Sequence, residues 1–119
     1  MSKYSAQKVA VLNPAELTIE ESCRVLITRE EMSNLENLAE LCHAEARKFG
    51  VGVQRIEVRE FREEENVIYF LVRLNIEEGE RVNDFLTHFI DPFENWLTSR
   101  DASFDADRFL VSISGRGRE

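Results

Sequence analysis

The sequence predicts a single α+β domain whose elements follow one another in the order βαββαβ. Two periodicities lead to this order. Apolar and polar residues alternate in four segments, which is typical of strands, and apolar residues recur at steps of three and four in two longer segments, which is typical of helices. The 119-residue chain contains only two prolines and five glycines, so few positions interrupt these patterns.

The first half of the chain predicts a strand and then a long helix. The strand covers residues 22–28. Thr28 and Glu31 have the spacing of a capping box, so we expect the helix to begin there, and Gly50 is the type of residue that ends one. The apolar stripe of this helix consists of Met32, Leu35, Leu38, Ala39, Cys42, Ala46 and Phe49.

The second half predicts two strands, a helix and a last strand. The strands cover residues 53–62 and 67–76, and the second of them is apolar on both sides, as is usual in the middle of a sheet. The helix follows Gly79. Because proline disfavours a helix interior, we expect this helix to be kinked or split at Pro92. The last strand is predicted around residues 109–113.

With right-handed crossovers, this order favours a ferredoxin-like two-layer sandwich: a four-stranded antiparallel sheet with two helices on one face. The first and third strands are then central. The predicted organisation is an N-terminal arm at 1–14, one α+β domain at 15–114 and a frayed tail at 115–119. An extra strand at residues 8–12 is an open alternative.

The composition limits the classes of partner. The net charge of −8, from 23 acidic and 15 basic residues, repels phosphate backbones and anionic membrane surfaces, so we expect neither nucleic-acid nor membrane binding. Cys23 and Cys42 have no metal-ligand spacing and are expected to be buried and reduced. With no signal peptide and no long apolar run, the expected location is cytoplasmic.

The sheet face that the helices leave open is the predicted contact surface. Its centre is apolar and several arginines surround it, which is typical of a protein interface. Arginines that simply solvate a strand surface are the alternative interpretation. The residues predicted to bind a partner are Arg24, Leu26, Arg55, Arg59, Tyr69, Leu71, Arg73, Arg108 and Leu110.

One group of side chains on the second predicted helix has catalytic potential. Asp84, His88 and Asp91 are spaced i, i+4 and i+7, so they share a helix face and have the chemistry of a general base with orienting carboxylates. An ordinary surface Asp–His pair explains the same spacing. The sequence has no glycine-rich phosphate loop, zinc-protease motif or serine elbow, so we expect no cofactor and no metal.

These observations favour a non-enzymatic interaction or regulatory module that forms a homodimer through the open sheet face. A protein partner other than a second copy is also compatible with this surface. The alternatives are a small-molecule-binding enzyme of the dimeric α+β barrel type and a sensor of an anionic ligand. Topology alone does not choose among them, because one fold hosts many functions.

Overall fold

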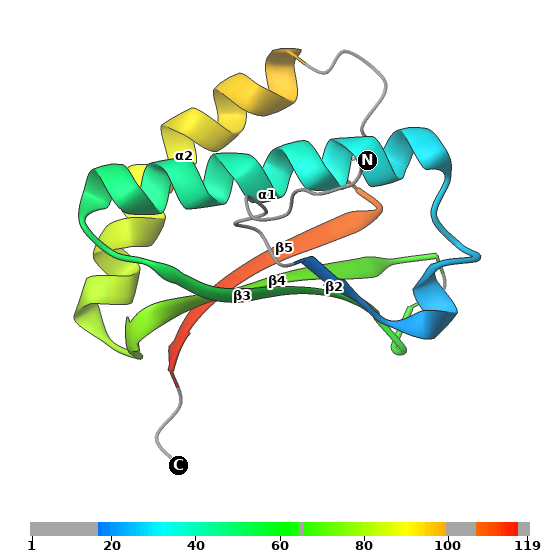
Figure 1. Cartoon of the computed structure of the whole chain (residues 1–119), viewed down its shortest axis with the longest axis horizontal. Helices are drawn as coiled ribbons and strands as arrows, with labels where there is room; N and C mark the ends of the chain where they lie inside the picture. The colour runs from blue at the N-terminus through cyan, green and yellow to red at the C-terminus, as the bar shows by residue number, and fades with distance from the viewer. Residues whose placement is uncertain (1–16, 65, 100–106, 117–119) are drawn as a thin grey trace, which may run out of the picture.

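The computed structural model describes residues 17–64, 66–99 and 107–116. Both helices lie on the same face of one sheet, so this part of the chain is a two-layer α+β structure (Figure 1). The elements in chain order are β2 (Leu17–Ile19), the 3₁₀ helix η1 (Glu21–Cys23), α1 (Arg29–Phe49), β3 (Val53–Glu60), β4 (Ile68–Glu77), α2 (Glu80–Ser99) and β5 (Phe109–Arg116).

The sheet is mixed, which makes the predicted antiparallel ferredoxin-like arrangement wrong. The strand order is β2-β3-β4-β5. Only β3 and β4 are antiparallel, whereas β2 pairs with β3, and β4 with β5, in parallel. The central strands are therefore β3 and β4, and both β2 and β5 lie at edges of the described sheet.

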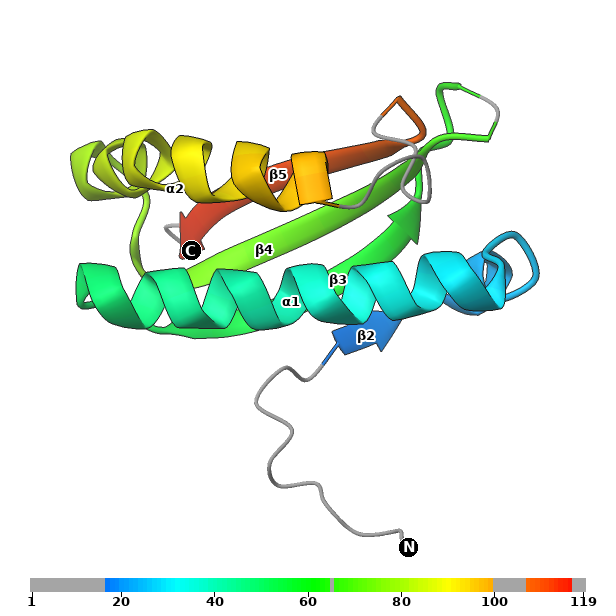
Figure 2. The same ribbon diagram turned by 90° about the horizontal axis from the view of Figure 1, so that it is seen from above.

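The handedness of one crossover explains this difference. The strands lie side by side in the order in which they occur in the chain, and the two central strands run in opposite directions. With this arrangement, both helices can lie on one face of the sheet only if the β2–α1–β3 and β4–α2–β5 connections have opposite hands. The β4–α2–β5 unit has the common right hand, and the β2–α1–β3 unit has the rare left hand (Figures 1 and 2). The preference for right-handed crossovers comes from the twist of the strands. Because β2 has only three residues, its twist is small and the preference for a right-handed β2–α1–β3 crossover is weak.

The predicted strand at 22–28 is also wrong. The strand lies earlier, at Leu17–Ile19, and residues 22–28 form the end of η1 and the turns before α1. Cys23 and Ile27 are buried, as the pattern indicated, but Val25 between them is 87% exposed. Cys23 and Ile27 are therefore buried because successive turns direct both side chains toward the core, not because they lie on the same side of a strand.

The start and end of α1 confirm the predicted signals. The Thr28 hydroxyl accepts a hydrogen bond from the Glu31 backbone amide at 3.1 Å, and the Glu31 carboxylate accepts one from the Thr28 amide at 3.0 Å. Gly50 ends the helix with φ of +92°, a left-handed conformation that glycine adopts without strain. Helix α2 continues through Pro92 as one helix, so it is not split.

The core lies between the helices and the sheet. Phe70 of β4 and Phe85 of α2 are the largest completely buried side chains. Along α2, the ring of Phe85 is followed by those of Phe89, Phe93 and Trp96, each stacked on the next at centroid distances of 5.6, 5.7 and 6.2 Å. This row of rings fixes the face that α2 presents to the sheet.

Both cysteines are free and completely buried, as predicted. Removal from water raises the pKa of the Cys42 thiol to about 12 and also raises the pKa of Cys23, because burial disfavours the thiolate. Since the thiolate is the reactive form, we expect neither cysteine to react with a thiol reagent such as DTNB at pH 8 until the chain unfolds. Both should react in denaturant. Rapid labelling of a thiol in the native protein would contradict this burial.

The C-terminal end of the domain in the structure differs slightly from the predicted one. The predicted tail begins at Gly115, whereas β5 continues through Arg116 and Gly115 is buried. The predicted arm at 1–14, the possible strand at 8–12 and residues 117–119 lie outside the described residues. Within the described ranges, no helix is both long and apolar enough to cross a membrane.

Candidate functional site: the open sheet face

The side of the sheet opposite the helices carries three rows of side chains that run across β3, β4 and β5. We call this surface the open face (Figure 1). The register of the strands defines its rows as Arg59, Tyr69 and Leu110; Glu57, Leu71 and Ser112; and Arg55, Arg73 and Ser114. Thr18 of β2 extends the second row, because it pairs with Glu57.

The apolar part of the open face lies beside the β3–β4 hairpin. Tyr69 and Leu71 are half-buried, and Leu110 is 39% exposed. The ring of Phe61 packs edge-on against Tyr69, with centroids 4.8 Å apart. These side chains form an apolar cluster at the hairpin end of the sheet, and neither helix covers it, because both lie on the other side of the sheet.

Positive charge dominates the strands of this face. It carries three arginines and one glutamate, so its net charge is +2, whereas the chain as a whole carries −8. The glutamate is already paired, since Arg55 Nε lies 3.5 Å from Glu57 Oε2. Arg59 and Arg73 form no ion pair with any residue in the described ranges. The structure therefore leaves two guanidinium groups available beside the apolar cluster.

A hollow of about 280 Å³ borders this cluster at the hairpin. Its lining residues are Arg59, Glu60, Arg62, Glu63, Tyr69 and Leu71. One wall is fixed by Glu20, whose carboxylate accepts hydrogen bonds from the Glu60 backbone amide at 2.8 Å and from Arg62 Nη2 at 2.9 Å. These bonds hold the pKa of Glu20 below its ordinary value, the backbone bond most strongly.

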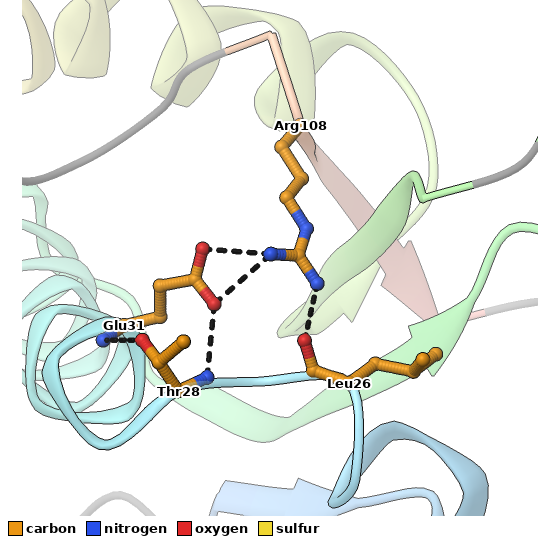
Figure 3. A network of polar contacts seen from close by, with 4 residues as sticks. All are labelled: Leu26, Thr28, Glu31 and Arg108. Carbon is orange, nitrogen blue, oxygen red and sulfur yellow. Dashed lines mark hydrogen bonds and ion pairs between the residues drawn. The ribbon is translucent and has the colours of Figure 1, made fainter.

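Three predicted contact residues lie elsewhere. Arg24 and Leu26 belong to the turns between η1 and α1, because the segment that was expected to form the first strand is not extended. Arg24 is exposed, and Leu26 packs against the core. Arg108 precedes β5, and its guanidinium is directed toward the start of α1 (Figure 3). The other six predicted contact residues do lie on the open face.

Arg108 joins the start of β5 to the start of α1. Its Nη1 atom donates to both carboxylate oxygens of Glu31, at 3.0 and 2.8 Å, and its Nη2 atom donates to the Leu26 carbonyl oxygen. The guanidinium also lies over the ring of Phe109, 5.5 Å from its centroid. Because Glu31 caps α1 at the same time, this network has a structural role, not a contact role.

The predicted catalytic row on α2 does not assemble as expected. Asp84 and Asp91 are exposed, whereas His88 lies partly buried between α1 and α2. Its Nε2 atom is 3.0 Å from Oε1 of Glu45, a buried residue of α1 that the sequence pattern did not identify. Lys48 holds the other oxygen of the same carboxylate at 3.1 Å.

His88 lies among aromatic side chains of both helices. Its ring packs against Phe49 and Phe85, with centroids 5.4 and 5.9 Å away. Neither His88 nor Glu45 lines the hollow beside the hairpin. Within the described ranges, no group of three or more His, Cys, Asp or Glu side chains has the geometry to hold a metal ion. The contact between His88 and Glu45 joins α2 to α1.

The fold and the open face together define a class: a small two-layer α+β domain with a mixed sheet, one side of which carries neither helix. Comparisons of the chain with protein-family models, curated proteins and solved structures found no match. The function must therefore be inferred from the chemistry of the surface itself.

Proposed function

We propose that this domain is a non-enzymatic interaction module that works as a homodimer through its open face. The observation that carries this proposal is the apolar cluster of Tyr69, Leu71 and Leu110 beside two arginines, Arg59 and Arg73. Neither arginine forms an ion pair within the described ranges, although Arg59 acts at longer range on Glu20. Tyrosine and arginine next to apolar side chains are the residues that contribute most to protein interfaces.

Packing two open faces against each other removes the apolar cluster of both copies from water. The strands hold these side chains in fixed positions, so little conformational entropy is lost on association. The charge works against the contact, because each face brings a net charge of +2. The arginines must then lie at the rim, where the stems cover apolar surface and the charged ends stay in water.

Leu71→Arg tests the proposal directly. An additional cation at the centre of the face should weaken self-association at least about tenfold, since a buried unpaired charge costs more than the leucine contributes. Light scattering over a range of concentrations measures the effect. Ile90→Arg makes the same apolar-to-arginine change at an exposed position of α2, on the other side of the sheet, and should leave the dimer intact.

The salt dependence gives a second readout. Because like charges face each other in the proposed dimer, added salt should strengthen self-association by screening them. A wild-type chain that stays monomeric at about 100 μM, a concentration at which even weak specific dimers are populated, would overturn the proposal. Equal dimerisation by Leu71→Arg and the wild type would overturn it as well.

A second candidate, binding of an acidic partner or small anion, is favoured by the same two arginines. Arg59 lines the hollow beside the hairpin, and Arg73 lies two residues along β4 from Leu71. Binding of an anion to these groups weakens as salt is added. The sign of the salt dependence therefore separates this candidate from the homodimer.

A further inference from the structure

The outer edge of β5 is unprotected in the described part of the chain. β5 is the last strand in the sheet order, so no described strand pairs with its far side. Proteins usually protect such an edge with a proline, a lysine or a bulge. The segment from Phe109 to Gly115 has neither proline nor charge, and the irregularity in its pairing with β4 comes only after Ser114.

The backbone geometry identifies which groups are available. Ile68 pairs with Phe109, and its amide donates to the Arg108 carbonyl at 2.8 Å. In a parallel ladder, alternate residues of a strand direct both backbone groups toward the same neighbour. Leu110 and Ser112 therefore face β4 with their N–H and C=O groups, whereas the groups of Val111 and Ile113 point away from the sheet.

The available segment ends at Gly115. Its amide is not available to another strand, because it already donates to Oε1 of Glu78 at 2.6 Å. The groups offered to another strand are thus those of Val111 and Ile113, on either side of Ser112. This set is self-complementary, because an antiparallel copy presents the same two residues in reverse order.

We propose that a second copy of the chain pairs with this edge, antiparallel and centred on Ser112. Val111 of one copy then lies opposite Ile113 of the other, and each pair exchanges both of its backbone hydrogen bonds. Ser112 lies opposite the same residue of the second copy. The result is one continuous sheet that runs through both domains.

The side chains along the edge support this register. Val111 and Ile113 are β-branched, a favourable cross-strand pair, and both are half-buried on the helix side. On the open face, Leu110 lies opposite Ser114. No like charges face each other between residues 109 and 115, although the chain as a whole carries −8. Arg108, which would approach Arg116, already has its charge paired with Glu31.

Edge pairing has a consequence for the open face. The two-fold axis of such a pair is perpendicular to the sheet, so the helices of both copies lie on one side and both open faces lie on the other. Each apolar cluster then reaches the seam at Leu110, which lies opposite Ser114 of the other copy. This contact uses a different surface from the packing of face against face, and it doubles the area of the open face available to a partner.

Opposite charges at Ser112 provide the sharpest test. Ser112 is exposed, so Ser112→Lys and Ser112→Glu should fold as stably as the wild type, which thermal denaturation checks. Each variant alone places like charges opposite each other and should dimerise at least about tenfold more weakly. A one-to-one mixture should restore dimers, because lysine then faces glutamate. Thr18→Lys, at the opposite edge of the sheet, is the matched control and should dimerise normally.

Cross-linking tests the register. Ser112→Cys should form an intermolecular disulfide under mild oxidation, since directly opposed residues in antiparallel strands bring their Cβ atoms to bonding distance. The native Cys23 and Cys42 are buried and give little background. No cross-link in Ser112→Cys, or unchanged dimerisation in both charge variants, would overturn the inference.

Two further variants separate this contact from the face-to-face dimer. Val111→Pro removes an amide that points away from β4, so it should abolish edge pairing and leave the open face intact. Leu71→Arg acts on the open face only. If Val111→Pro dissociates the dimer and Leu71→Arg does not, the result supports edge pairing and rejects the face-to-face dimer. If Leu71→Arg dissociates the dimer and Val111→Pro does not, the result rejects edge pairing and supports the face-to-face dimer.

Discussion

Replacing Arg108 with alanine is expected to lower the free energy of unfolding by about 3 kcal/mol, the low end of the range for breaking a buried ion pair. The Arg108 side chain is only 20% exposed, and its partner Glu31 is similarly enclosed. Its loss leaves the Glu31 carboxylate and the Leu26 carbonyl without their shared donor. Unsatisfied polar groups in such a position carry most of the cost.

Two further variants test whether the loss of stability comes from the Arg108 guanidinium network in particular. Arg108→Lys should recover little of the stability, because a single ammonium group cannot bond Glu31 and Leu26 together in the way that a planar guanidinium does. Arg62→Ala removes an ion pair of similar length, to Glu20 at 2.9 Å, but its side chain is 65% exposed and should change stability little. Urea denaturation followed by circular dichroism measures all three. Equal losses in Arg62→Ala and Arg108→Ala would contradict a structural role for the network.

Gly115→Ala is expected to cost a similar amount, about 3 kcal/mol, because the added methyl group has no room. A Cβ at this position would lie 2.6 Å from the Ile76 carbonyl oxygen, 2.7 Å from the Glu78 nitrogen and 2.8 Å from the Glu77 carbonyl carbon. All three are backbone atoms of the adjacent segment, which cannot move as a side chain can. The variant must therefore separate the ends of β4 and β5 or strain them.

Gly52→Ala is the control for Gly115→Ala. A Cβ at Gly52 would meet only the Cβ of Asn75, at an ordinary contact distance of 3.9 Å. Its stability should stay near that of the wild type or rise by up to about 1 kcal/mol through a less flexible unfolded state. Thermal denaturation of both variants checks the contrast. A neutral Gly115→Ala would show that β4 and β5 do not approach each other this closely.

Local signals in the sequence predicted much of the fold, because they depend on neighbouring residues. The capping box of Thr28 and Glu31 and the left-handed Gly50 fix the ends of α1 by themselves. The failures concern long-range structure. The spacing of Cys23 and Ile27 fits both a strand and a series of turns, and only the exposure of Val25 decides between them. Likewise, the sheet order depends on the hand of one crossover, which no residue pattern encodes.

The candidate site shows the same division. The alternation of residues along β3 and β4 predicted correctly which side chains share the open face, because successive side chains of a strand point to opposite faces of the sheet. Arg108 was misplaced because alternation was extended beyond the start of β5, to a residue that lies in a turn. For His88, helix spacing selected Asp84 and Asp91, but its partner Glu45 comes from the other helix. Contacts between helices are not readable from the spacing within one of them.

The short edge strand β2 has a consequence for the order in which the domain folds. The β3–β4 hairpin joins residues that are close in the chain. By contrast, a whole helix separates β2 from β3 in the chain, and another separates β4 from β5. Closing such loops slows folding until the new contacts compensate for the lost entropy. β5 gains eight residues of strand by doing so, but β2 gains only three. The hairpin is therefore the natural nucleus, the right-handed unit with α2 completes it, and β2 joins last.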